Sequence, residues 1–292
     1  MDSYPLTKVN SKLISKILDK EVNFESEINY LARLEDFHGK KNTLTYANNK
    51  EYALKAVELG YSFILIKQED IFPTKKVNFI TTKNPRHSFL KIIDYLNCNK
   101  HYSNINKLIG ENVTYGNNVE ISDNVQIGNN VHIGHNVIIF ENVIIEDNVN
   151  IGNFCILGSK GYDVDILDNQ LKYTGIHGGL KIGENSILRN FVNIDSSIWG
   201  HNTIIGKNVA IDSNVLIGHD VSVSQNVNIR GGATIAGFSR IGKNTIIGVE
   251  TVITQRSQIG ENCLTTAGSI ISKNYPNGSK IISFPPKVQK IQ

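Results

Sequence analysis

The sequence is poor in cysteine, tryptophan and methionine, and it lacks long apolar runs. Its three cysteines, Cys98, Cys155 and Cys263, are far apart and form no CxxC pair. An odd, scattered set of cysteines argues against a disulfide framework and a zinc-finger spacing, and it fits a reducing cytoplasm. No run of about 18 apolar residues occurs, and the N-terminal MDSYPLTKVN contains no apolar segment. We therefore expect a cytoplasmic protein without a membrane span or a secretory signal.

The sequence also lacks a strong excess of positive or negative charge. The chain carries 30 Lys and Arg against 27 Asp and Glu, a formal net charge of +3, and the two signs are interspersed. Nucleic-acid binding normally requires basic residues clustered on one face or stretch, so we expect no nucleic-acid partner. With 292 residues, 40% of them hydrophobic, the chain is long enough for two domains with their own cores.

What the sequence does contain is a six-residue repeat, which begins GENVTY GNNVEI SDNVQI GNNVHI GHNVII FENVII EDNVNI. Valine fills the first apolar position of these units, and Ile usually follows two residues later, which is the periodicity of a strand with one buried face. Asn precedes the valine in all seven units. Because Asn tolerates the left-handed backbone conformation, the repeat predicts a β-solenoid of very short strands joined by tight corners.

The repeat is interrupted once and ends before the C-terminus. We expect a solenoid over residues 106–272 that carries an inserted loop at 158–179, followed by a short tail at 273–292. Such insertions in a repeat array often form the binding face. Residues 1–105 lack the repeat and alternate helical segments such as SFLKIIDYL with apolar runs such as YSFILIK. This alternation predicts an N-terminal α/β domain.

The six-residue units resemble those of the hexapeptide-repeat acyltransferases. The resemblance implies a left-handed parallel β-helix, triangular in cross-section, with about three units in each coil. It also implies a homotrimer, because members of that family place their active sites between neighbouring subunits. Flat exposed faces and open coil ends are a physical reason for such association.

Four segments narrow the resemblance. GGLKIGENSILRNFVNID, VAIDSNVLIGHDV, LTYANNKEY and NPRHSFLKII are similar to segments of the UDP-3-O-acylglucosamine N-acyltransferases. This similarity implies transfer of an acyl group from a thioester, acyl-CoA or acyl carrier protein, to the amine of a nucleotide-linked amino sugar. It further implies that Tyr46 and Tyr52 hold the nucleobase and that Asn49 hydrogen-bonds it.

Three departures from that family leave the acceptor and the donor open. Asp195-Ser196-Ser197 stands where the family has Asp-Arg-Gly, Arg256 stands where it has a pocket histidine, and the long C-terminal helix that helps dock acyl carrier protein is missing. The acceptor is therefore either the lipid A precursor of that family or another UDP- or dTDP-linked amino sugar of lipopolysaccharide or surface polysaccharide synthesis. The donor is acyl-CoA or acyl carrier protein, and we expect no tightly bound cofactor.

His219, in SNVLIGHDVSV, is the predicted catalytic residue. N-acylation requires the sugar ammonium to lose a proton, and an imidazole, with an ordinary pKa of about 6.5, accepts one near neutral pH. The match to the family's catalytic histidine adds to this interpretation. No covalent enzyme intermediate is required, and a backbone N–H at a corner near Gly237 is a candidate donor to the oxyanion that develops.

Three further residues are candidates for orienting or loop roles. His201 lies 18 residues before His219, about one coil, and either orients it or merely adjoins it. His177 belongs to the inserted loop, and Asp195 is a candidate orienting acid. His135 occupies the same position in its own unit, IGHNV, as His219 does, so the repeat alone does not select the base.

Two alternatives come from other classes. A trimeric zinc hydratase of the γ-carbonic-anhydrase kind uses the same solenoid, but it needs a close histidine pair, and His201 and His219 do not have the HxxxxH spacing. We therefore expect no metal. A scaffolding solenoid without catalysis is the other alternative, although it needs neither the inserted loop nor the α/β domain.

Overall fold

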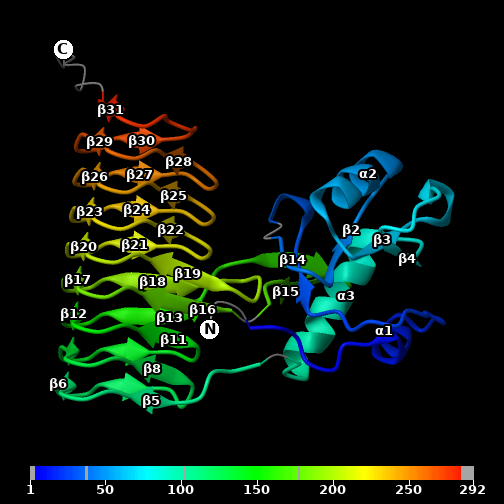
Figure 1. The fold of residues 1–292 in the computed structure, drawn as a ribbon, viewed down its shortest axis with the longest axis horizontal. Coiled ribbons are helices and arrows are strands. Elements are labelled where there is room, and N and C mark those ends of the chain that lie inside the picture. Colours follow the sequence, from blue (N-terminus) through cyan, green and yellow to red (C-terminus); the bar gives the residue numbers. More distant parts are fainter. Residues whose placement is uncertain (1–3, 37–38, 102, 177, 284–292) are drawn as a thin grey trace, which may run out of the picture. The chain divides into compact units, whose positions relative to one another are not determined.

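The structure, a computed structural model, describes residues 4–36, 39–101, 103–176 and 178–283. The chain divides into two compact units (Figure 1). The first unit contains Met1–Asn104 together with two later segments, Tyr162–Gly178 and Ile198–His201. The second unit contains the remaining residues, including nearly all of the repeat.

The first unit is built on a parallel sheet. Its elements are α1 (Ser11–Leu18), β1 (Tyr30–Leu31), η1 (Leu34–Asp36), β2 (Thr43–Tyr46), α2 (Lys50–Leu59), β3 (Phe63–Ile66), η2 (Gln68–Asp70), β4 (Asn78–Thr81) and α3 (Pro85–Cys98). The sheet order is β1-β2-β3-β4. All of β3 is buried, as expected for a parallel strand covered on both faces. Asn10, Asn49 and Asn84 cap the three α-helices, each accepting a backbone N–H of the first turn.

The segment expected as an inserted loop at 158–179 contains an antiparallel β-hairpin, β14 (Val164–Leu167) and β15 (Gln170–Tyr173). Asp168 and Asn169 form its turn, both with positive φ, and this backbone suits the twist of a two-residue hairpin. The hairpin is tied to the rest of the first unit by ion pairs. Arg33 Nη2 lies 2.9 Å from Asp163 Oδ2, and Arg86 pairs with Asp165.

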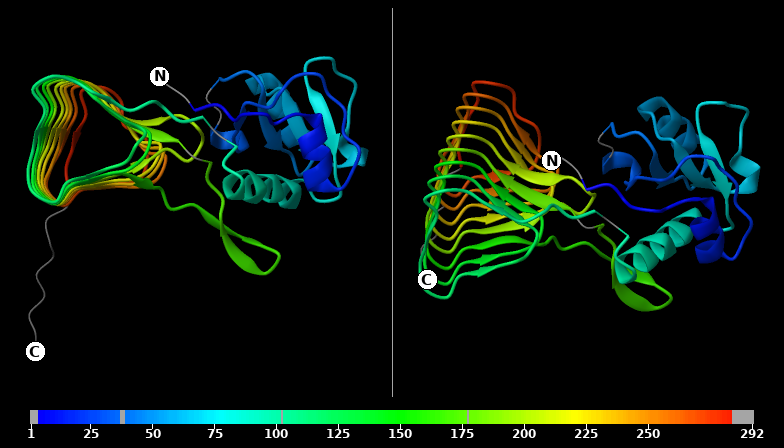
Figure 2. Two further views of the ribbon diagram at one scale, coloured as in Figure 1. Left: turned by 90° about the horizontal axis from the view of Figure 1, so that it is seen from below. Right: turned by 60° about the horizontal axis from the view of Figure 1, so that its bottom comes forward.

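The second unit is a solenoid with three parallel sheets, and the end-on view in Figure 2 shows its three sides. The first face consists of β5 (Leu108–Ile109), β8 (Val125–Ile127), β11 (Val143–Ile145), β16 (Gly179–Ile182), β19 (Asn202–Ile205), β22 (Ser222–Val223), β25 (Arg240–Ile241) and β28 (Gln258–Ile259). The second face consists of β6 (Thr114–Tyr115), β9 (His132–Ile133), β12 (Asn150–Ile151), β17 (Ile187–Leu188), β20 (Ala210–Ile211), β23 (Asn228–Ile229), β26 (Ile246–Ile247), β29 (Leu264–Thr265) and β31 (Lys280–Ile281). The third face consists of β7 (Glu120–Ile121), β10 (Ile138–Ile139), β13 (Ile156–Lys160), β18 (Asn193–Ser196), β21 (Leu216–Ile217), β24 (Thr234–Ile235), β27 (Val252–Ile253) and β30 (Ile270–Ile271).

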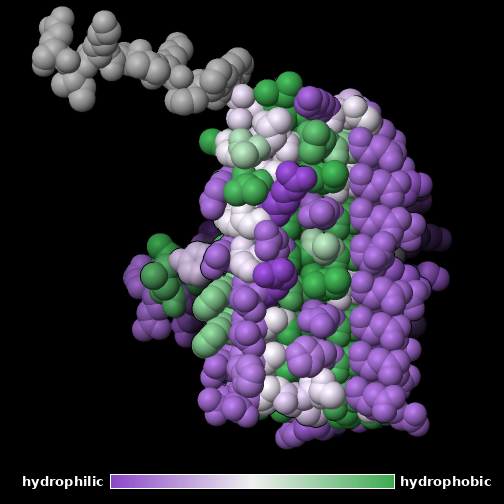
Figure 3. All heavy atoms as spheres, turned by 90° about the vertical axis from the view of Figure 1, so that its left-hand side faces the viewer, coloured by the Kyte–Doolittle hydropathy of each residue, from purple (hydrophilic) through white to green (hydrophobic). Residues whose placement is uncertain are grey.

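The apolar positions of the repeat form one continuous core inside this solenoid. The Val and Ile side chains of the predicted inward positions are buried from Val125 to Ile271. At the corners, nearly all Asn residues that precede Val adopt φ values of 53–61°, the left-handed conformation expected for them, and Asn124 is the exception. Side-chain amides at one corner also hydrogen-bond from coil to coil, as between Asn226 and Asn244 at 3.1 Å. Figure 3 shows a hydrophilic strip running along the height of the solenoid beside apolar patches.

Strand pairing of the solenoid continues to β31, which pairs with β29, and so extends beyond residue 272, where the repeat pattern fades. The last part of the expected tail, residues 284–292, lies outside the described residues. Among the helices that the structure describes, none combines the length and the apolar character needed to cross a membrane.

Candidate active site

His219 lies at the corner between β21 and β22, where the chain passes from the third face to the first. Its side chain is only 10% exposed. Two glycines flank the residue. A Cβ added to Gly237 would lie 2.7 Å from His219 Cε1, and one added to Gly161 would collide with His219 Cβ. The imidazole therefore occupies a slot that exists only because both flanking residues lack a side chain.

The imidazole is held by a buried carboxylate. His219 Nδ1 lies 2.8 Å from Asp220 Oδ2, and the Asp220 side chain is 1% exposed. Ser197 Oγ donates to Asp220 Oδ1 at 2.6 Å, and the Asp220 backbone N–H donates to Thr203 Oγ1 at 2.9 Å. Because an ionised carboxylate only accepts hydrogen bonds, a neutral His219 ring paired with it carries its proton on Nδ1, and Nε2 keeps its lone pair.

Asp220 also forms the corner itself, with φ at 59°, in a position where most units have Asn. The same corner position one and two coils later holds Phe238 and Arg256, both with φ at 62°. The Phe238 ring meets His219 edge-on with centroids 5.0 Å apart, and the Arg256 guanidinium carbon lies 4.6 Å from the Phe238 centroid. Bulky residues in this conformation cost about 1–3 kcal/mol each and concentrate at functional sites.

Asp195, a candidate orienting acid, is held differently. It lies on β18, and Ser159 Oγ donates to its Oδ1 at 2.7 Å. Burial raises the pKa of the Asp195 carboxyl, while the Ser159 hydrogen bond and the charge of His219 lower it. The carboxylate that reaches His219 Nδ1 is that of Asp220, a residue that sequence reasoning did not single out. Asp195 is thus a half-buried acid in the electrostatic neighbourhood of the imidazole.

The other histidines fall elsewhere. His135 is exposed at the corner between the second and third faces, where its Nδ1 accepts the Asn117 N–H at 2.9 Å. It therefore occupies a different corner from His219, although both have the same position within their repeat units. His201 belongs to the first unit, with its Nδ1 3.5 Å from the Trp199 carbonyl oxygen. His177 lies outside the described residues.

The residues matched to nucleobase binding lie in the first unit, around the carboxyl end of β2. Tyr46 packs on Phe89 with ring centroids 5.2 Å apart, and burial raises the pKa of its phenol. Asn49 Oδ1 accepts the Tyr52 backbone N–H at 3.0 Å, so its carbonyl caps α2 while its amide NH2 points to no partner among the described residues. Tyr52 is 51% exposed and presents an open ring face.

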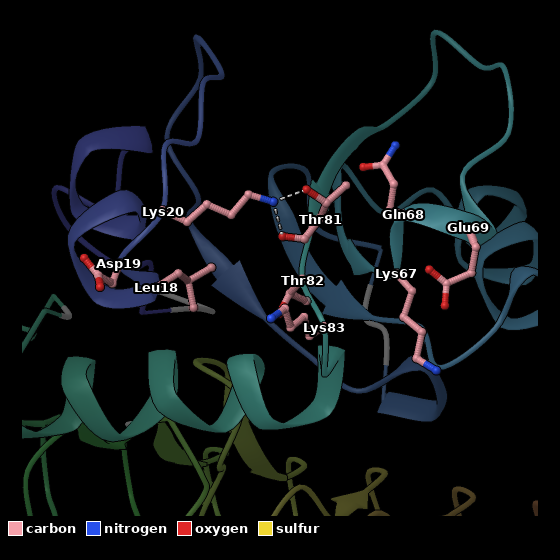
Figure 4. A pocket seen from close by; sticks show the side chains of 9 residues that line it. All are labelled: Leu18, Asp19, Lys20, Lys67, Gln68, Glu69, Thr81, Thr82 and Lys83. Atoms are coloured by element: carbon pink, nitrogen blue, oxygen red, sulfur yellow. Dashed lines mark hydrogen bonds between the residues drawn. The ribbon is translucent and has the colours of Figure 1, made fainter.

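A groove of about 700 Å³ also lies in the first unit (Figure 4). Lys20 reaches across it and hydrogen-bonds to the Thr81 carbonyl at 2.9 Å, and Lys67 and Lys83 line it as well. None of the sequence-predicted site residues is among those that line it. Within the described ranges, no group of three or more His, Cys, Asp or Glu residues is arranged to hold a metal ion.

No protein-family model matches the chain, and no curated protein matches it. Solved structures do. UDP-N-acetylglucosamine acyltransferase from Campylobacter jejuni matches with 27% identity and a TM-score of 0.51, over 57% of this chain and 64% of that enzyme. LpxA from Acinetobacter baumannii matches with 25% identity and a TM-score of 0.56, over 62% of this chain and 69% of its own. Perosamine N-acetyltransferase from Caulobacter crescentus matches at 11% identity with a TM-score of 0.24, over 85% and 96%.

The Campylobacter and Acinetobacter enzymes agree with the three-sided solenoid of this chain. The predicted fold, a left-handed parallel β-helix with an N-terminal α/β region, is confirmed. This chain covers less than two thirds of the length of the Campylobacter enzyme. The closer resemblance to the UDP-3-O-acylglucosamine N-acyltransferases remains a prediction.

The glycine slot around His219 gives a first prediction. Gly237→Ala should push the imidazole out of place, because the new Cβ would lie 2.7–2.8 Å from Cε1 and Nε2. We expect a cost of about 1–3 kcal/mol in unfolding free energy, as for overpacked sites, and a changed His219 side-chain NMR signal. Gly231→Ala is the matched control, because its nearest atoms are 3.3 Å away and do not include His219. An unchanged His219 signal in Gly237→Ala would contradict the slot.

Proposed function

We propose that this protein is an N-acyltransferase that moves an acyl group from a thioester to the amine of a nucleotide-linked amino sugar. The observation that carries the proposal is the buried His219, with its proton held on Nδ1 by Asp220 and its Nε2 lone pair available. This is the geometry of a general base with a fixed tautomer, placed in a glycine-lined slot at a corner of an acyltransferase-type solenoid.

The chemical step follows from this geometry. The sugar nitrogen, as the free amine, attacks the thioester carbonyl carbon, His219 Nε2 takes the proton that the nitrogen then loses, and the C–S bond breaks as the tetrahedral intermediate collapses. The thiolate leaves and takes that proton from the His219 imidazolium, so that amide and free thiol are the products. Asp220 stabilises the imidazolium that forms in between, because its buried carboxylate already bonds to Nδ1.

The oxyanion needs a donor at the same corner. Gly237 meets this need in two respects, since a Cβ at this residue would touch the imidazole and its N–H makes no hydrogen bond to the described residues. We assign it the oxyanion role. Asp195 would attract the incoming ammonium, because its carboxylate is held by Ser159 near His219. Arg256, which stacks on Phe238, would help form the pocket for the acyl donor.

The nature of the substrates rests on the neighbours and on the first unit. UDP-N-acetylglucosamine is the acceptor named for the Campylobacter neighbour, which supports a nucleotide sugar as the acceptor here. Tyr46, Asn49 and Tyr52 would bind the base, with acyl-CoA or acyl carrier protein as donor. The acceptor would be either the lipid A precursor or a UDP- or dTDP-linked amino sugar of surface polysaccharide synthesis. A mass-spectrometric screen of these sugars and donors, with UDP-N-acetylglucosamine as a hydroxyl acceptor, distinguishes them.

The test of the central proposal is His219→Ala. We expect kcat to fall about 10²–10⁴-fold, the usual contribution of a positioned acid or base, while KM changes little. In the wild type, kcat/KM should fall toward acid pH, because a protonated imidazole cannot accept a proton, and the variant should lack that limb. His135→Ala, at an exposed corner, is the matched control. Wild-type turnover by His219→Ala from pH 5.5 to 9 would rule His219 out as the base.

Removal of the exposed tyrosine ring tests the nucleotide assignment. Tyr52→Ala should raise KM for the nucleotide sugar more than it lowers kcat, because a base bound far from the reacting amine contributes equally to ground state and transition state. Loss of one base stack, about 1–3 kcal/mol, corresponds to roughly a 5- to 150-fold rise. Tyr115→Ala is the control, because Tyr115 is also exposed but lies in the solenoid, outside the first unit. An unchanged KM in Tyr52→Ala would show that Tyr52, on α2, does not bind the nucleobase.

We also propose that the protein is a homotrimer. The third face exposes a row of large apolar side chains on its strands, Ile156, Leu216, Val252 and Ile270. Beside this row, Phe154 and Phe191 stack in parallel at 4.9 Å. Both phenylalanines have φ at 58°, where other units have Asn, so their rings are kept despite a backbone cost. Asn193 and Thr234 occupy the strands between those of the apolar row, so the apolar side chains form an interrupted patch. Exposed apolar side chains gathered on one face favour association of identical subunits.

Light scattering tests the trimer. The wild type should have about three times the chain mass of 32.5 kDa. The trimer of the double variant Phe154→Asn/Phe191→Asn should be weaker and should dissociate at a higher protein concentration than the wild-type trimer. The monomer itself should not be destabilised, because each Asn suits the left-handed backbone and relieves strain there. Ile204→Asn, a similarly exposed site on the first face, should leave the mass unchanged. A monomeric wild type would contradict the proposal.

A further inference from the structure

Ser197 is a buried hydroxyl whose partner is the carboxylate behind the imidazole. It immediately follows β18 and is 1% exposed. Its backbone N–H donates to the Gly179 carbonyl at 3.0 Å, so the residue is fixed by hydrogen bonding to the first residue of β16. From there its Oγ donates to Asp220 Oδ1 at 2.6 Å. The short distance is typical of an O–H group that donates to a charged oxygen.

Both oxygens of the Asp220 carboxylate therefore have a hydrogen-bond partner. Oδ1 accepts from Ser197 and Oδ2 faces His219 Nδ1, while the Asp220 backbone N–H is bound to Thr203. Rotation of the carboxylate about the Cβ–Cγ bond would break the bond to Ser197, the bond to His219, or both. Because the Asp220 side chain is 1% exposed, water is poorly placed to replace a lost partner, and the bound orientation is strongly favoured.

We propose that Ser197 is a positioning residue for the base, which keeps the His219 proton on Nδ1 by holding Asp220 in line with it. This inference rests on the proposed role of His219. Without the Ser197 hydroxyl, Asp220 can turn within its pocket, and the imidazole can exchange its proton to Nε2. In that tautomer Nε2 is a donor and no longer accepts the proton of the sugar nitrogen.

The six-residue repeat does not account for a serine at position 197. Ser197 lies in Asp195-Ser196-Ser197, the triplet in which this chain departs from the UDP-3-O-acylglucosamine N-acyltransferase pattern, and the hydroxyl stands where that pattern has Gly. The preceding Ser196 is buried as well, but its Oγ donates to the Ser159 carbonyl oxygen at 3.1 Å. The two adjacent serines thus have the same size and similar burial. The Ser197 hydroxyl bonds to Asp220, whereas the Ser196 hydroxyl bonds to Ser159.

The imidazole tautomer can be read directly, without any substrate. Long-range 1H–15N spectra of protein labelled with 15N-histidine report which ring nitrogen carries the proton, and the His219 signal is assigned by its loss in His219→Asn. At a pH where the ring is neutral, the wild type should show the Nδ1–H form alone. Ser197→Ala should show a mixture of both forms, and so should Ser197→Gly, the second variant in case the first does not fold.

Two controls separate positioning from stability. Ser196→Ala should keep the pure Nδ1–H form even if its unfolding temperature drops, and Ser197→Thr, which retains a hydroxyl, should restore the wild-type spectrum. A pure Nδ1–H signal in both Ser197→Ala and Ser197→Gly would overturn the proposal.

Kinetics supplies the second readout. Ser197→Ala should lower kcat about 10- to 100-fold, a typical loss for a residue that orients a functional group, with little change in KM for either substrate. A rise in KM with unchanged kcat would contradict the positioning role. If no sugar is acylated by the wild type, the proposed function fails, whereas the tautomer measurement still decides whether Ser197 controls His219.

Discussion

Hydrogen bonding between successive coils is the constraint on which the solenoid depends. Each short strand pairs in parallel with the strand above and below it, and each corner must turn in very few residues so that the pairing stays in register. Glycine at the corners allows backbones of adjacent coils to approach. A Cβ on Gly134, for example, would lie 2.7 Å from the carbonyl carbon of Gly152 in the next coil. The left-handed residue that follows completes the turn.

The proposed catalytic group uses this same constraint. His219 occupies the corner position between a glycine and a left-handed residue, and that residue is Asp220 instead of Asn. A carboxylate of similar size and similar tolerance for positive φ can thus make the turn and hold the imidazole at once. Stacking then supplies the rest, because the coil above contributes Gly237, which leaves space for the ring, and Phe238, which closes its side.

Three departures from the repeat lie at this corner. Asp220, Phe238 and Arg256 each replace the usual Asn and follow one another at one corner of successive coils. Two of them are bulky residues in a conformation that disfavours them, which a repeat built only for stability would avoid. Their spacing of 18 residues, one coil, is a signal that was present in the sequence. It becomes visible only when the residues are sorted by corner, and the length of a coil must be known to do so.

The sequence by itself determined the solenoid, its short strands, its inward Val and Ile and its Asn corners, because each is a local periodic requirement of strand and turn. It also singled out His219 and Gly237 as candidates. Only the tertiary structure decided that His135 and His219 lie at different corners, that Asp220 rather than Asp195 bonds Nδ1, and that Ser197 grips Asp220. Ser197 and Asp220 lie 23 residues apart, and Asp220 adjoins His219 but bonds to it only in the side-chain geometry of the folded corner, so no periodic pattern encodes these contacts.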